Sequence, residues 1–203
     1  ALTWNSPDNQ TLSGDAYPAT AEYGATLDAL PEYTEENMVF LGWANSYGEL
    51  LTTSTRITGA MTFTAQVVPL LPGSGTAESP YELDSPEDLV TLRKIVASGN
   101  TAYNSSSVFY KLTADIDLSS VCGEETGSWT PIGDYSRPFK ANFDGGGKTI
   151  SNLYISSTSD YQGLFGRVYG TYSGYAVIKD LALSGSVTGD ESVGLLAGYA
   201  GYA

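Results

Sequence analysis

The sequence contains no histidine and only one cysteine, Cys122. Without histidine the chain cannot form an imidazole metal site or a Ser/His or Cys/His catalytic pair. A single cysteine can neither close an internal disulfide nor form a thiolate zinc site. These absences exclude a large share of hydrolase, redox and zinc chemistry. We predict a protein that is not an enzyme, with no catalytic, cofactor-binding or metal-binding residue and no cofactor.

Basic residues are also scarce. Nine Lys and Arg stand against 23 Asp and Glu, for a net charge of -14. Residues 1–68 carry one base and eight acids, and the remainder carries eight and fifteen. This negative field repels nucleic acid and anionic membranes. The apolar runs are far shorter than the roughly 20 residues of a membrane helix. We therefore expect no nucleic-acid partner and no membrane insertion by this segment.

The residues that are present favour a folded, mostly β chain. Hydrophobic residues make up 41% and charged residues 16% of the sequence, which is typical of globular proteins. Residues 2–4, 38–43 and 61–67 alternate apolar and polar side chains, a pattern typical of strands. Prolines and glycines over residues 69–75 predict a linker between residues 1–68 and 76–203.

The first segment contains an ordered set of aromatic residues and glycines. The set comprises Tyr23-Gly24, Leu30-Pro31, Phe40-Leu41-Gly42-Trp43, Gly48, Ile57-Thr58 and residues 61–67. This arrangement resembles the Listeria-Bacteroides repeat, a small module of bacterial surface proteins. The resemblance covers most of residues 1–68 and implies a β-grasp-like fold.

One helix is predicted directly after the linker. Ser85 can cap its first turn, Pro86 suits the first helical position, and Gly99 suits its end. Between them, apolar residues recur at helical spacing over about 13 residues. We expect this helix to use its apolar stripe to cover the open end of a sheet.

Short β patterns repeat from about residue 108 onward. Residues 150–155 and 178–183 share an I-x-x-L-x-(I/L) pattern. Gly-Leu motifs at 163–166 and 194–198 follow them at a slightly wider spacing, and we interpret the difference as a loop insertion. A repeating β unit of about 30 residues predicts a solenoid.

These motifs resemble the GLUG-motif repeat family of secreted or wall-attached bacterial proteins. The resemblance extends to the segments before the repeats, 79–83, 85–98, 109–118, 129–133 and 139–150, and so spans residues 75–203. It implies a right-handed parallel β-helix whose first coil is capped by the N-terminal helix. Because an uncapped last coil would leave strand edges unpaired, we expect the solenoid to continue in further repeats or domains of the same chain.

A pair of aspartates and a run of glycines can each be interpreted in more than one way. Asp115 and Asp117 lie two positions apart on a predicted strand, so their side chains share one face and their α-carbons are about 6.6 Å apart. This distance is near the carboxylate spacing of a glycosidase. They could also ligate calcium, or simply face solvent while Ile116 and Leu118 fill the core. The glycine run at 145–147 lacks the spacing of a phosphate-binding loop and is interpreted as a tight β-turn.

Fifteen tyrosines are the one compositional surplus, and several gather around the repeats. These are Tyr161, Tyr169, Tyr172, Tyr175, Tyr199 and Tyr202. Tyrosines among serine and glycine are typical of binding surfaces, but stacked tyrosines also stabilise sheets without any ligand. The ligand-binding residues therefore stay unknown at this stage.

Together these features predict an extracellular, adhesin-like surface protein fragment, secreted or attached to a cell wall. Its partner would be a host glycan or an extracellular protein. The alternative is an accessory, non-catalytic region of a large secreted enzyme, such as the immunoglobulin-A peptidase in which GLUG-type repeats are found. A polysaccharide-active β-helix is the third hypothesis, and fold analogy alone does not decide among them.

Overall fold

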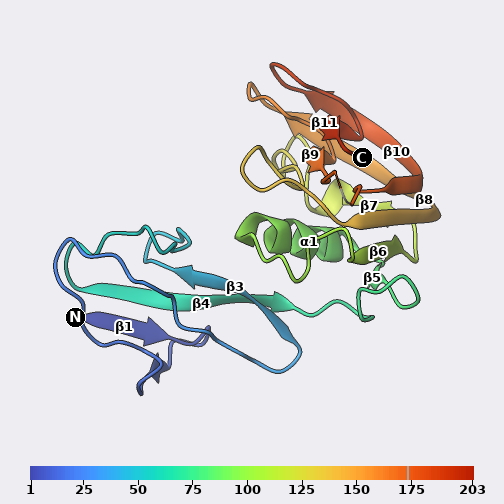
Figure 1. Cartoon of the computed structure of the whole chain (residues 1–203). Helices are drawn as coiled ribbons and strands as arrows, with labels where there is room; N and C mark the ends of the chain where they lie inside the picture. Colours follow the sequence, from blue (N-terminus) through green and yellow to red (C-terminus); the bar gives the residue numbers. More distant parts are fainter. Residues whose placement is uncertain (173) are drawn as a thin grey trace. The chain divides into compact units, whose positions relative to one another are not determined.

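The computed structural model describes residues 1–172 and 174–203, and these are mostly β. They form two compact units, Ala1–Leu70 and Leu71–Ala203, which are described separately below (Figure 1). In the described part of the chain, no helix is long and apolar enough to cross a membrane.

The first unit is a four-stranded sheet in the order β2-β1-β4-β3. Its strands are β1 (Leu2–Asn5), β2 (Thr11–Leu12), β3 (Met38–Ala44) and β4 (Met61–Pro69). The central strands β1 and β4 are parallel, and both outer strands are antiparallel to their neighbours. The three strands predicted from alternation are confirmed, and β2 is an additional short edge strand.

Two tryptophans organise the core of this unit. The Trp4 ring lies 4.9 Å from that of Trp43 and 4.8 Å from that of Phe63, between ring centroids. The Trp4 indole N–H donates to the Pro18 carbonyl at 2.8 Å, and that of Trp43 donates to the Pro31 carbonyl at 2.7 Å. The irregular segment between β2 and β3 is therefore anchored to the core although it contains no regular element.

The residues predicted as a linker are ordered parts of the two units. Pro69 ends β4, and Leu71 is buried in the core of the second unit. The Pro72 carbonyl accepts a hydrogen bond from the Glu82 amide at 2.8 Å. Within the stretch 69–75, the first unit therefore ends at Leu70 and the second begins at Leu71.

The predicted helix is confirmed as α1 (Pro86–Ser98). The Ser85 side chain accepts from the Asp88 amide, and the Asp88 carboxylate accepts from the Ser85 amide, which completes a capping box. Gly99 ends the helix with a left-handed φ of 79°, a conformation that glycine adopts without strain. The apolar stripe of α1, including Leu89 and Leu92, is buried in the core.

The second unit stacks parallel strands in two sheets. The larger has the order β10-β8-β6-β5, with β7 also paired to β8, and the smaller pairs β9 with β11. The bounds are β5 (Tyr81–Leu83), β6 (Phe109–Leu112), β7 (Ile116–Asp117), β8 (Asn142–Ser156), β9 (Phe165–Tyr169), β10 (Ile178–Thr188) and β11 (Ala197–Gly201), with a short 3-10 turn at Leu118–Ser120. Figure 1 shows α1 near β5 and β6, away from β10 and β11.

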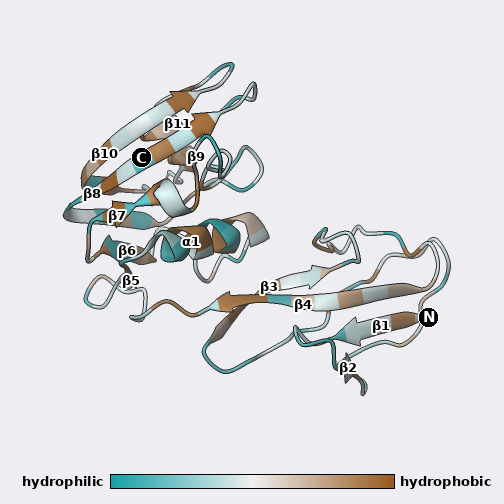
Figure 2. Ribbon diagram, turned by 180° about the vertical axis from the view of Figure 1, so that it is seen from behind, coloured by the Kyte–Doolittle hydropathy of each residue, from teal (hydrophilic) through white to brown (hydrophobic). Residues whose placement is uncertain are grey.

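Equivalent positions on successive strands fill one continuous core. Tyr110 of β6 lies opposite Phe143 of β8, and Phe143 lies opposite Ile178 of β10. In the same core, the Phe139 and Phe165 ring centroids lie 4.9 Å apart. The brown segments of β8 and α1 in Figure 2 include inward-facing residues of this core.

The glycines of the Gly-Leu-x-Gly motif sit where neighbouring segments approach closely. A Cβ on Gly163 would lie 2.5 Å from the Gly194 carbonyl oxygen, and one on Gly166 would lie 2.3 Å from that of Gly133. Leu164, between them, is fully buried. The motif thus combines an inward leucine with two positions that have no room for a side chain.

The two I-x-x-L-x-(I/L) segments lie on neighbouring strands, but their matching positions are not paired with each other. Ile178 lies opposite Phe143, and Ile150 is paired with Leu183 instead of Ile178. The shared pattern recurs after 28 residues, whereas the paired residues Ile150 and Leu183 are 33 apart, so a repeated apolar pattern does not by itself specify the register. The register also changes at the glycine run 145–147, which forms a bulge within β8 opposite Asp180 instead of a tight turn between strands.

Candidate functional site: a tyrosine face

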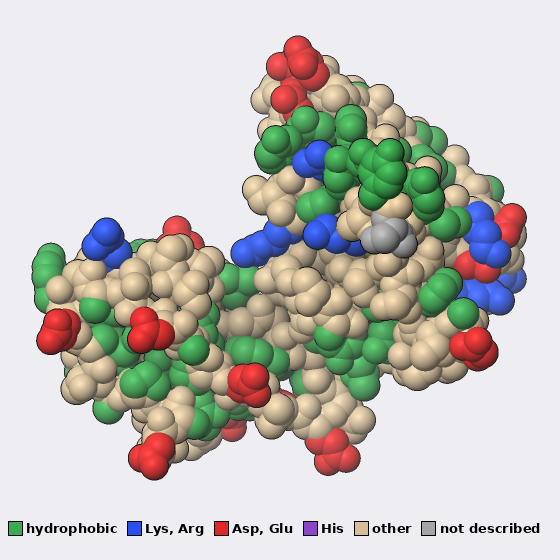
Figure 3. Space-filling view, in the orientation of Figure 1, with side chains coloured by type: hydrophobic (Ala, Val, Ile, Leu, Met, Phe, Trp, Pro, Cys, Tyr) green, Lys and Arg blue, Asp and Glu red, His purple; other side chains and the backbone are tan. Residues whose placement is uncertain are grey.

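Six tyrosines of the second unit form a continuous chain of ring contacts, which we call the tyrosine face. Neighbouring ring centroids are 5.4–6.3 Å apart. Its members, in order of contact, are Tyr135, Tyr161, Tyr199, Tyr169, Tyr202 and Tyr172. Tyr135 is 67% and Tyr172 is 87% exposed, so the ends of the chain of rings are open to solvent. In Figure 3, hydrophobic side chains gather around basic ones in the part of the second unit that carries β9 and β11.

A single arginine holds three of these rings. The Arg167 guanidinium carbon lies 4.7 Å from the Tyr135 ring centroid, 4.6 Å from that of Tyr169 and 5.2 Å from that of Tyr199. The same guanidinium donates a hydrogen bond to the Tyr135 carbonyl at 2.9 Å. A cation placed over several ring faces stabilises their arrangement, so the exposed rings are positioned before any ligand arrives.

The parallel pairing of β9 and β11 generates this arrangement. Arg167 and Tyr169 point outward from β9, whereas Val168 between them is buried. Tyr199 of β11 lies opposite Arg167, and Gly201 lies opposite Tyr169. A Cβ on Gly201 would lie 2.9 Å from the Tyr169 ring, so glycine leaves the space that this ring occupies.

Five of the six tyrosines that the sequence singled out belong to the face. The sixth, Tyr175, is 59% exposed. Sequence reasoning missed Tyr135 and Arg167. A signal was available, because Tyr135, Arg167 and Tyr199 are evenly spaced along the sequence, at an interval close to that between paired residues of neighbouring strands.

A groove of about 580 Å³ adjoins the tyrosine face. Tyr135 and Tyr161 line one part of it, and Arg93 and Lys94 of α1 line another. Asp160 also lines it and is held in place, since its carboxylate accepts from the Glu191 amide at 3.1 Å. Aromatic rings beside fixed charged groups form a surface that can both stack on a ligand and hydrogen-bond to it.

The two aspartates considered for catalysis or calcium binding link neighbouring strands. The Asp115 carboxylate accepts from the Thr149 amide at 2.8 Å. That of Asp117 accepts from the Ser119 amide at 2.9 Å and from the Asn152 side chain at 2.8 Å, and these bonds lower the pKa of Asp117. Ile116, between them, is buried. Among residues 1–172 and 174–203, no group of three or more Asp, Glu or Cys side chains could hold a metal ion.

Cys122, the only cysteine, is buried among core residues of the second unit. Its Sγ lies 3.6 Å from the Asn152 carbonyl. Burial raises the pKa of the thiol, which keeps it in the unreactive protonated form.

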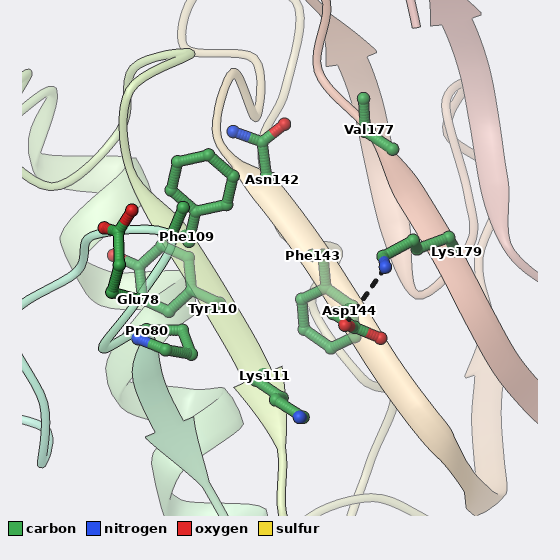
Figure 4. Close-up of a pocket in the computed structure, with 11 residues that line it drawn as sticks. Glu78, Pro80, Phe109, Tyr110, Lys111, Asn142, Phe143, Asp144, Val177 and Lys179 are labelled. Carbon is green, nitrogen blue, oxygen red and sulfur yellow. Dashed lines mark ion pairs between the residues drawn. The ribbon is translucent and has the colours of Figure 1, made fainter.

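A second hollow, of about 440 Å³, lies on the outer face of the larger sheet (Figure 4). At one side of it, the Lys179 ammonium pairs with the Asp144 carboxylate at 3.3 Å. Burial raises the pKa of Asp144, but a hydrogen bond from the Gly146 amide and the charges of Lys179 and Lys111 outweigh burial and leave this pKa below its usual value.

The lowered pKa of Asp144 predicts a contribution to acid sensitivity. An unfolded aspartate takes up its proton near pH 3.8, whereas folded Asp144 stays ionised to lower pH. The stability that this carboxylate contributes is therefore present above pH 3.8 and is lost as the pH falls through the folded pKa. Asp144→Asn should make the free energy of unfolding depend less steeply on pH in that acidic range, as measured by urea unfolding. Part of the slope will remain because Asp117 has a lowered pKa as well. Asp15→Asn, in the first unit, is the control, and an equal change in slope for both variants would contradict the assignment.

Comparison with known proteins gives two partial similarities. The chain is 40% identical over 134 residues to halomucin of Haloquadratum walsbyi, a match that covers 62% of this chain and 1% of halomucin. It is 28% identical over 127 residues to a putative Gly-rich membrane protein of Evansella cellulosilytica, covering 62% of this chain and 13% of that protein. The chain thus spans only a small fraction of either relative. No family model and no solved structure matches it.

Proposed function

We propose that this chain is a non-catalytic contact module of an extracellular surface protein, and that it binds a glycan through the tyrosine face. The observation that carries this proposal is the chain of exposed rings held by Arg167. The C–H faces of a sugar pack on electron-rich ring faces. Its hydroxyl groups find donors and acceptors in the Arg93, Lys94 and Asp160 side chains of the adjoining groove.

The scaffold in this proposal is a right-handed parallel β-solenoid of the GLUG type, capped by α1. Parallel pairing of β5, β6, β8 and β10, and of β9 with β11, supports it. The first unit would be a β-grasp-like module related to the Listeria-Bacteroides repeat, which its parallel central strands support. The names of the two relatives, halomucin and a putative Gly-rich membrane protein, agree with a place at the cell surface.

The proposal is tested by screening the chain against immobilised glycans and mucin. Tyr135→Ala and Tyr199→Ala each remove one ring of the face, and we expect each to weaken a saturable interaction about tenfold or more, as for central aromatic residues of other interfaces. Binding affinity is measured by titration of each variant with the glycan that the chain retains.

The matched control is Tyr47→Ala, which removes an 88% exposed tyrosine of the first unit. This variant should bind as the unaltered chain does. Absence of saturable binding across the array, or an equal loss in the Tyr47 variant, would contradict the proposal. Circular dichroism of each variant separates a lost contact from a lost fold.

A further inference from the structure

The inward side chains of β10 are less covered than their counterparts on β8. Phe143, Ile150 and Ile155 of β8 are at most 1% exposed. The residues paired with them on β10 are Ile178, Leu183 and Val187, and these are only partly buried. Because position and chemistry are equivalent, the difference reflects what lies on the far side of each strand. β8 lies between β6 and β10, whereas β10 has a single partner strand among the described residues.

The outer face of the same sheet carries a row of alternating charges. Glu82 of β5 lies opposite Lys111 of β6, Lys111 lies opposite Asp144 of β8, and Asp144 lies opposite Lys179 of β10. We call these four residues the charge row. Figure 4 shows Lys111 and Lys179 on either side of Asp144, with the ion pair to Lys179 drawn.

Alternation of sign has a physical reason in a parallel stack. Neighbouring strands lie about 4.8 Å apart, and like charges directly opposite each other destabilise the pairing. The row ends at Lys179, whose side chain is 57% exposed and also lies 3.6 Å from Asp180 of its own strand. A negative charge on the next strand would continue the alternation, and a positive one would break it.

We infer that the free edge of β10 is a docking surface for a further parallel β segment that carries Asp or Glu opposite Lys179 and an apolar side chain opposite Ile178. The apolar side chain would cover the half-buried core positions, and the acidic one would pair with the lysine. This inference rests on the stacked-strand scaffold of the proposed function and not on the glycan.

A second copy of this chain does not supply such a strand from its described residues. Its β10 would bring Lys179 instead of an acid. Its β5 carries Glu82, but the Glu82 amide is already bonded to the Pro72 carbonyl at 2.8 Å. Its Asp144 lies on β8, which is paired on both edges. Its β7 has Ile116 and Asp117 in the required order, but the Asp117 carboxylate already accepts from the Ser119 amide and the Asn152 side chain. Charge and edge occupancy therefore favour a separate segment as the occupant.

The probe is a synthetic peptide with the sequence of residues 142–156, which presents Phe143 and Asp144 in the required order. The control peptide carries Asp144→Lys. Binding to the full chain is measured by fluorescence anisotropy of the labelled peptide, and hydrogen exchange locates the protected amides. We expect protection over β10 and a roughly three- to tenfold higher affinity for the acidic peptide, the range set by exposed charge pairs.

A charge reversal in the full chain provides the decisive comparison. Lys179→Glu changes an exposed side chain, and in this variant the preference should invert, so that the lysine peptide binds more tightly. An unchanged preference, protection elsewhere in the chain, or no binding of either peptide would overturn the inference. So would concentration-dependent dimerisation with protection of β10 in the absence of peptide, because the occupant would then be a second copy. Glycan binding by the Lys179→Glu variant is measured separately. If this variant still binds the glycan but shows no inverted peptide preference, the docking inference fails while the proposed function of the tyrosine face stands.

Discussion

Replacing Trp129 with alanine should remove about 3–5 kcal/mol from the free energy of unfolding of the second unit, the usual cost of truncating a large buried aromatic residue. Trp129 is 2% exposed, and its indole N–H donates to the Leu164 carbonyl at 3.1 Å. The Arg93 guanidinium lies 5.1 Å from its ring centroid. Because a domain is stable by only about 5–15 kcal/mol, we expect a large decrease in the urea midpoint measured by circular dichroism.

The first unit offers a matched control for this prediction. Trp43 is fully buried, and its indole N–H also donates to a backbone carbonyl, that of Pro31. The two tryptophans belong to separate cores. Hydrogen exchange should therefore show lost protection in the second unit for Trp129→Ala and in the first unit for Trp43→Ala. Equal loss in both units for either variant would contradict the independence of the cores.

Gly166→Ala should also destabilise the second unit, by about 1–3 kcal/mol, the range for overpacked cores. The added Cβ would lie 2.3 Å from the Gly133 carbonyl oxygen, and a backbone atom cannot move aside as a flexible side chain can. The Gly166 amide is itself bonded to the Ile132 carbonyl at 3.0 Å, so the two segments cannot separate without losing that bond. Urea unfolding of the variant measures the cost.

Gly59→Ala is the control for the glycine substitution. An added Cβ at Gly59 meets nothing within 4 Å, and its backbone conformation is open to other residues. This change should be neutral or stabilising, by up to about 1 kcal/mol, because alanine restricts the unfolded chain. Comparable destabilisation by both substitutions would show that close approach of neighbouring segments is not what Gly166 permits.

The sequence predicted those elements whose causes are local. The helix at 86–98 follows from Ser85, Pro86 and Gly99, residues that act within one or two turns. Likewise, alternation over short stretches revealed β1, β3 and β4. In both cases the signal and the structure occupy the same stretch of chain.

Features that depend on strand register could not be predicted in the same way. Ile150 lies opposite Leu183 although Ile178 holds the matching position of the repeated pattern, because an apolar pattern does not specify which residues lie opposite each other. The glycine bulge in β8 then shifts the register further. Tyr135 and Arg167 were overlooked for the same reason, since they meet only when segments distant in the sequence are stacked.

The charge row had no sequence signal of its own. Lys111, Asp144 and Lys179 are ordinary charged residues that lie far apart in the sequence, and only the pairing of β6, β8 and β10 makes them neighbours. Counting charges along the chain gave a net value and its distribution, but not the order of signs across the sheet.

The length of chain between Ile150 and Leu183, which lie opposite each other on neighbouring strands, also sets the proportions of the second unit. One further layer of chain advances the stack by a single strand spacing of about 4.8 Å, whereas the same stretch in a helix would extend about 50 Å. A long stretch of chain therefore adds little to the length of the stack. Paired residues of neighbouring strands, such as Arg167 and Tyr199, lie side by side, so a polymeric partner that crosses several strands would make several weak contacts at once.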